Sequence, residues 1–151
     1  MIYTTVEARQ KVLSDIAIAI AQIAVALTAL GEACEGLDER RADILEAQLF
    51  RPVQLAYGRA KRTHADFAAR SGLAVTSLEQ PAVPHPQSPQ ALIDRAVFAA
   101  GEADQTLADL QDSMLPVEVG DPELRAGLAA VRESLSKLPS RARELVRTVG
   151  R

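Results

Sequence analysis

The chain has 151 residues, with 17 Lys and Arg against 20 Asp and Glu, and its only aromatic residues are two Tyr and three Phe. This length suits one domain that buries a core of its own. The single Cys34 excludes an internal disulfide and a multi-cysteine metal site. The Ala- and Arg-rich composition favours a bacterial protein, and the single Cys fits the reducing cytoplasm. With one Cys and two His that are far apart in sequence, we expect no metal, and we expect no cofactor.

The first predicted element is a long helix over residues 5–35 that has almost no polar face. Between Asp15 and Gly31 the only polar residues are Gln22 and Thr28. A helix that is apolar all round must be covered on every side, and we expect so short a chain not to cover it alone. The sequence therefore predicts self-association, with a dimer favoured, or binding to another helical protein. The predicted interface consists of Ile16, Ile18, Ile20, Ile23, Val25 and Leu27.

The same apolar run favours a buried helix over a membrane segment. It has 15 residues between Asp15 and Gly31, which is short of the roughly 20 that span a bilayer. The residues before it mix acids and bases, whereas a signal peptide begins with a basic stretch. We expect no membrane role.

The second predicted helix runs from an N-cap at Asp38 to Ser71, where Gly72 ends it. Pro52 lies inside this helix and is expected to kink it or to split it in two. Residues 72–87 then form a proline-rich linker, because closely spaced prolines favour an extended chain.

Two further helices follow the linker. One begins with Ser88 and Pro89, which are typical of a helix start, and is expected to end at Pro116. The other begins with Asp121 and runs to residue 149, with a kink at Pro139. The prediction is a single all-α domain, 1–151, in which helical hairpins at 5–71 and 88–149 form an up-down-up-down four-helix bundle with kinked second and fourth helices.

Charge is distributed unevenly along the chain. Acidic residues gather around the two interhelical turns, and basic residues gather toward the ends of the second and fourth helices. In an up-down-up-down bundle those two ends lie together, so the pattern predicts a basic end that binds nucleic acid or an acidic partner. The absence of interleaved exposed aromatic residues disfavours single-stranded nucleic acid. The residues of this predicted basic end are Arg59, Lys61, Arg62, Arg70, Arg141, Arg143 and Arg147.

The residues Arg59 and His64 have the spacing Arg-x4-His. This spacing resembles the motif of HEPN-type helical ribonucleases, small bundles that dimerise, although Ala60 stands where that family usually has a polar residue. The resemblance implies that Arg59 and His64 from two subunits meet at a cleft and act on RNA. Read without the resemblance, His64 continues the apolar stripe between Ala60 and Phe67 and is a core-edge imidazole.

These observations favour a non-catalytic helical-bundle protein that self-associates through its first helix. The alternative is a nucleic-acid-binding or HEPN-like ribonuclease protein that uses the basic end with Arg59 and His64.

Overall fold

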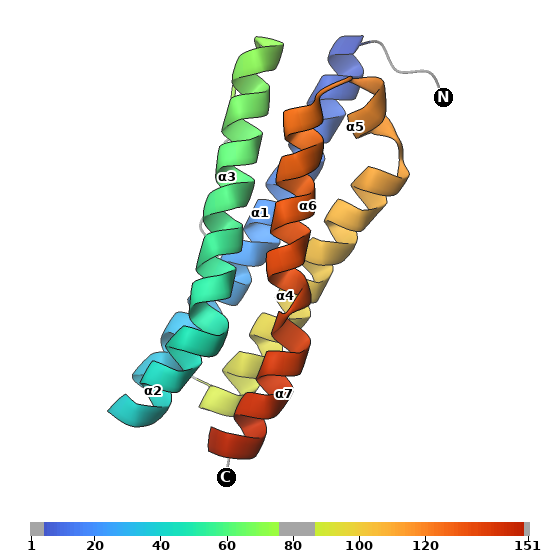
Figure 1. Cartoon of the computed structure of the whole chain (residues 1–151). Coiled ribbons are helices and arrows are strands. Elements are labelled where there is room, and N and C mark those ends of the chain that lie inside the picture. The colour runs from blue at the N-terminus through green and yellow to red at the C-terminus, as the bar shows by residue number, and fades with distance from the viewer. Residues whose placement is uncertain (1–4, 76–86, 150–151) are drawn as a thin grey trace.

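The computed structural model describes residues 5–75 and 87–149, and these are all-α, with no strand among them. Long helices lie side by side along the molecule (Figure 1). The elements are α1 (Thr5–Glu35), α2 (Glu39–Leu45), the π-helical turn η1 (Glu46–Phe50), α3 (Arg51–Ser71), α4 (Pro89–Asp112), α5 (Leu115–Glu118), α6 (Pro122–Ser136) and α7 (Leu138–Val149).

The helix starts are set by local side-chain caps, as the sequence predicted. The Asp38 carboxylate accepts a hydrogen bond from the backbone N–H of Arg41 at 2.9 Å. Ser88 and Asp121 cap α4 and α6 in the same way. Each cap satisfies a backbone donor that has no partner within its helix. At the other end of α3, Gly72 adopts φ 68°, the left-handed conformation that closes a helix.

Two prolines interrupt helices without removing their apolar faces from the core. Pro52 lies in the first turn of α3, directly after η1, so the helical path from Glu39 to Ser71 widens there and continues. A π turn accommodates a proline because it relaxes the hydrogen-bond register that proline cannot maintain. Before Pro139 the path breaks at Lys137, and the residues on both sides of this break, Leu135 and Leu138, are buried.

The end of α4 differs from the prediction. The helix ends at Asp112, and Met114 adopts a positive φ of 66°. Pro116, expected to end the helix, lies instead at the start of the short helix α5, where a proline is well tolerated. Met114 is consequently 52% exposed and does not continue the apolar stripe of α4.

The order of helix directions also differs from the predicted up-down-up-down arrangement. Helix α3 ends at the top of Figure 1, whereas α4 begins at the bottom, so these two helices run the same way. The surroundings of Gly36, which follows α1, agree with these directions. A Cβ atom placed on Gly36 would lie 3.2 Å from Cγ of Pro89, so the end of α1 lies beside the start of α4. The described helices follow a down-up-up-down order. The predicted linker therefore joins opposite ends of the molecule, and its residues 76–86 lie outside the described ranges.

Helix α1 is antiparallel to both α3 and α4, and its contact with α4 is the most extensive in the molecule. Gln22 faces α4, where its side-chain oxygen accepts a hydrogen bond from Thr106 at 2.8 Å. The residue three positions before Gln22 and the residues four, seven and eleven positions after it share that helix face. We call these the alanine seam of α1, and all of them are buried: Ala19, Ala26, Ala29 and Ala33.

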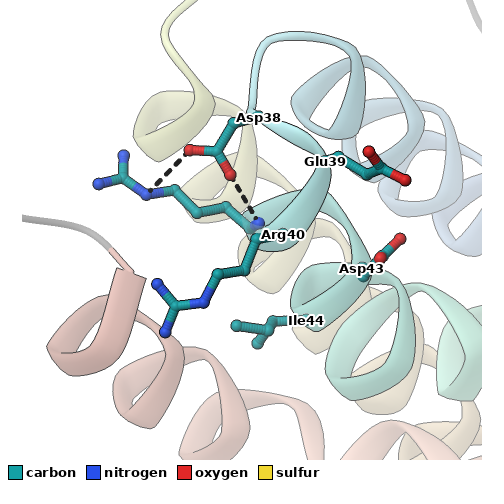
Figure 2. Close-up of a pocket in the computed structure, with 6 residues that line it drawn as sticks. Asp38, Glu39, Arg40, Asp43 and Ile44 are labelled. Carbon is teal, nitrogen blue, oxygen red and sulfur yellow. Dashed lines mark hydrogen bonds and ion pairs between the residues drawn. The ribbon is translucent and has the colours of Figure 1, made fainter.

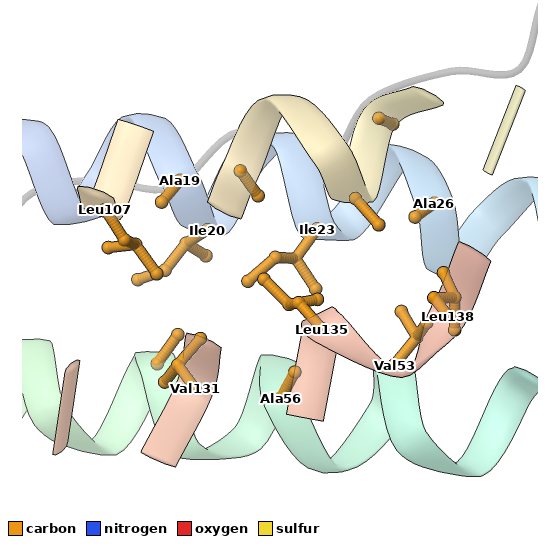
Figure 3. Packing of buried hydrophobic residues seen from close by; sticks show 14 of the residues in the cluster. Ala19, Ile20, Ile23, Ala26, Val53, Ala56, Leu107, Val131, Leu135 and Leu138 are labelled. Carbon is orange, nitrogen blue, oxygen red and sulfur yellow. The ribbon is translucent and has the colours of Figure 1, made fainter. Parts of the chain in front are cut away.

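The chain itself covers one side of α1. The side chains of Ile20 and Ile23 point into a core that also contains Val53 of α3, Leu107 of α4 and Leu135 of α6 (Figure 3). By length and composition alone α1 is apolar enough to cross a membrane, and half of its most apolar window is buried inside the protein. The chain's own helices therefore cover half of this window, contrary to the expectation that so short a chain leaves α1 uncovered.

Candidate functional site

The predicted α1 interface is largely internal. Ile16, Ile20 and Ile23 are at most 1% exposed because they pack on the chain's own helices. Val25 and Leu27 are partly buried against the same core. Ile18 alone among the six predicted residues is well exposed, at 51%. A partner that docks on α1 thus meets Ile18 and the edges of Val25 and Leu27, and no broad apolar surface.

The residues of the predicted basic end do not gather at one end of the molecule. Arg70 lies in the last turn of α3, at the top of Figure 1, whereas Arg59, Lys61 and Arg62 lie in the middle turns of that helix. Arg141, Arg143 and Arg147 lie on α7, at the bottom. This separation follows from the helix directions, because α3 and α7 end at opposite ends.

At the top of the bundle, basic and acidic groups neutralise one another. Arg70 forms ion pairs with Asp121 at 2.8 Å and with Glu123 at 2.9 Å. The hydrogen bond to Asp121 raises the pKa of Arg70. Burial opposes ionisation of Asp121, but the hydrogen bonds that its carboxylate accepts from Arg70 and the Leu124 backbone outweigh this and lower its pKa. Arg70 is therefore engaged within the fold and unavailable to a ligand.

A charged hollow at the α1–α2 turn is explained by helix capping. It is lined by residues 38–41, 43 and 44. The dashed lines from the Asp38 carboxylate in Figure 2 are its hydrogen bond from the backbone N–H of Arg41 and its ion pair with the guanidinium of the same residue. The ion pair between these two residues measures 3.5 Å. The same carboxylate satisfies the helix start and neutralises the arginine, so we assign this hollow a structural role.

Arg59 and His64 do not converge. The Arg59 guanidinium donates a hydrogen bond to Ser134 of α6 at 3.1 Å, whereas His64 is 1% exposed and interacts with the backbone of Leu13 in α1. The Nε2 atom of His64 is buried and makes no hydrogen bond. A ribonuclease histidine must reach its substrate, so this arrangement does not form the site that the HEPN resemblance implies. The interpretation of His64 as an imidazole on the apolar stripe agrees with its burial.

The burial of His64 predicts a pH-dependent stability. Burial lowers the pKa of His64, although the Leu13 backbone hydrogen bond acts in the opposite direction. Below the unfolded-state pKa of about 6.5, the unfolded chain binds a proton that the folded chain binds only at lower pH. The free energy of unfolding should therefore decrease as the pH falls below about 6.5 toward the folded-state pKa. Urea denaturation between pH 7.5 and pH 5, roughly the range of the titration, measures this.

The variants His64→Gln and His64→Leu should each flatten that pH dependence, whatever they do to stability at neutral pH. An unchanged slope in both variants would show that other groups cause it.

An apolar groove lies between α4 and α7 and has a volume of about 530 Å³. Phe98 on α4 is 59% exposed, the most exposed of the large apolar side chains that the structure describes. Charged residues also line the groove, with Asp94 on the α4 wall and Arg143 and Arg147 on the α7 wall. The remaining lining residues are Ile93, Val97, Pro139, Ala142 and Val146. We call this surface the α4–α7 groove.

Sequence reasoning missed this groove because it followed the buried stripe of the third predicted helix. Phe98 lies off that stripe, between Ala96 and Ala100, which are both buried. A signal was nevertheless present: one of only five aromatic residues falls on a helix position that faces away from the core. Exposed aromatic residues are enriched at protein interfaces.

A second surface, the arginine face of α3, points away from the core. It is a shallow hollow lined by Arg51, Gln54, Leu55, Gly58, Arg59 and Arg62. Among the described residues, the ion pairs involve none of these three arginines. Of the predicted basic residues, the structure thus brings Arg59 and Arg62 together with Arg51, which the prediction did not include. Lys61 lies instead over the ring of Tyr57, at 5.1 Å from its centroid.

Other reactive groups are not arranged for chemistry in the described part of the chain. Burial raises the pKa of the Cys34 thiol, and Glu46 and Glu35 act in the same direction, so the nucleophilic thiolate is disfavoured. No group of three or more metal-ligating side chains occurs among the described residues.

Comparisons with protein-family models, with curated proteins and with solved structures find no match to this chain.

Proposed function

We propose that this chain is a non-catalytic protein, built as a four-helix bundle, that acts by self-association through the α4–α7 groove. The observation that carries this proposal is the 59% exposure of Phe98 over an apolar groove. Aromatic side chains beside a pocket are typical of residues that dominate binding energy at protein interfaces. The α4–α7 groove takes the place of the first helix in this proposal, because the buried isoleucines of α1 are unavailable to a partner.

Three single substitutions distinguish the groove from the other exposed apolar positions. Phe98→Glu should weaken self-association by roughly 30-fold or more, since truncation of an interface anchor costs about 2 kcal/mol or above. Ile18→Glu and Leu55→Glu place the same charge on α1 and α3, at positions 51% and 49% exposed, and should leave the association unchanged. Size-exclusion chromatography with light scattering measures the mass, which is 16.2 kDa for one chain.

A monomeric wild-type protein at all accessible concentrations would reject self-association. If Ile18→Glu were the only variant that lost the dimer, the interface would lie on α1 and not in the groove.

The arginine face of α3 favours a second candidate function, the binding of a nucleic-acid backbone. Arg51 and Arg62, which form no ion pair among the described residues, line this hollow beside Arg59, whose guanidinium is bonded to Ser134. Guanidinium groups offer bidentate donors for phosphate oxygens. This function needs no contribution from His64, and we propose it as binding without cleavage.

The substitution of Arg51 and Arg62 by Gln tests this second function. Binding of a labelled RNA or DNA duplex should weaken with increasing salt, and the double variant should reduce the slope of log K against log salt by about two. Arg141→Gln together with Lys137→Gln, which removes two positive charges from another surface, is the matched control. No binding at low salt would reject this candidate.

A further inference from the structure

We infer that the α4–α7 groove is occupied by the same groove of a second copy, in a two-fold arrangement. In this arrangement Phe98 of each copy enters the groove of the other, and Asp94 of each copy faces Arg143 and Arg147 of the other. The inference rests on the proposed function and specifies its geometry and its polar contacts.

The shape of the α4–α7 groove suits a two-fold interface. A two-fold interface brings the same surface of both subunits together, so the surface must contain features that complement each other. The α4–α7 groove contains both: an aromatic side chain that projects into solvent and, beside it, a hollow of about 530 Å³ lined by Ile93, Ala142 and Val146. A hollow of this size accommodates a phenyl ring together with parts of its neighbouring side chains.

The charges on the walls of the groove suit the same arrangement. The two walls of the groove have opposite sign, because Asp94 lies on α4 and both arginines lie on α7. These groups form no ion pair with one another in the described chain; Asp94 accepts a hydrogen bond from Gln90 at 2.9 Å. A partner helix of uniform charge would match only one wall. A second copy matches both, when its α7 wall meets Asp94 and its α4 wall meets the arginines.

The experiment uses two variants whose charges are complementary only to each other. Asp94→Arg makes both walls of the groove positive, and the double variant Arg143→Glu/Arg147→Glu makes both walls negative. Each variant alone should dissociate roughly tenfold or more readily than the wild type, because like charges then face each other. An equimolar mixture should form a 1:1 heterodimer, in which both pairs of facing walls have opposite sign. Native mass spectrometry resolves the three possible dimers by mass.

A third chain, which carries all three substitutions, should dimerise with itself, since exchange of the walls restores both pairs. The variant Arg141→Glu places an acid on α7 outside the lining of the groove and should dimerise as the wild type does. Restoration by mixing also excludes misfolding as the cause of dissociation, because an unfolded chain cannot form the heterodimer.

The outcomes separate this inference from the proposed function. If Phe98→Glu abolishes the dimer but mixing restores nothing, the two-fold arrangement is wrong and the groove remains an interface of another geometry. If the wild type forms no dimer, both fail. A selective heterodimer, together with a dimer of the third chain, establishes the arrangement.

Discussion

Replacement of Gly127 by Ala is expected to decrease the free energy of unfolding by about 1–3 kcal/mol, although alanine favours helices more than glycine does. Gly127 lies in α6 where this helix crosses α3. A Cβ atom built there would meet the hydroxyl oxygen of Thr63 and would lie 2.8 Å from its Cγ2 and 3.1 Å from its Cβ. The last of these contacts cannot be relieved by rotation of the side chain, so the helices must separate.

Matched glycines and a compensating change make this prediction specific. Gly58→Ala and Gly101→Ala add the same methyl group to helix positions with nothing within 4 Å of the new atom, and each should stabilise the protein by about 0.5–1 kcal/mol. Thr63→Ala removes two of the three clashing atoms and should recover part of the loss in a double-mutant cycle. Urea denaturation measures the four single variants and the double variant, and a stabilised Gly127→Ala protein would contradict the close approach of α3 and α6.

The second large effect is expected at the alanine seam. Ala26→Leu inserts three carbon atoms at a position that is fully buried, on the face of α1 that packs on α4. Overpacking of a dense interior commonly costs 1–3 kcal/mol. At the most extensive helix contact in the molecule, the displacement extends along both helices, so we expect a loss of at least about 3 kcal/mol.

Ala21→Leu is the control, because Ala21 lies on the same helix and is exposed. Its free energy of unfolding should change by less than about 0.5 kcal/mol. Equal stability of the two leucine variants, measured by thermal and urea denaturation, would show that α1 and α4 do not pack closely.

Features encoded by neighbouring residues could be predicted from the sequence. The starts of three helices follow from Asp38, Ser88 and Asp121, whose side chains cap the next turn. The directions of the helices could not be predicted, because the composition of a linker does not say at which end of a bundle it arrives. That one difference also separated the α3 and α7 residues of the predicted basic end.

The alanines of α1 explain the other error. In the sequence these alanines look like excess apolar surface, from which we predicted a partner that covers α1. In the fold the same small side chains let α4 approach closely, so the surface is covered from within. The candidate site could not be predicted from periodicity. Periodicity identifies the residues that face the core, whereas Phe98 lies on the opposite side of α4.

The alanine seam has a consequence for how the molecule unfolds. Its two sides belong to different halves of the chain, since α1 precedes residues 76–86 and α4 follows them. Neither half alone contains a surface that can replace the other. We therefore expect the two hairpins to unfold in a single cooperative transition, because loss of either one removes the surface on which the other packs.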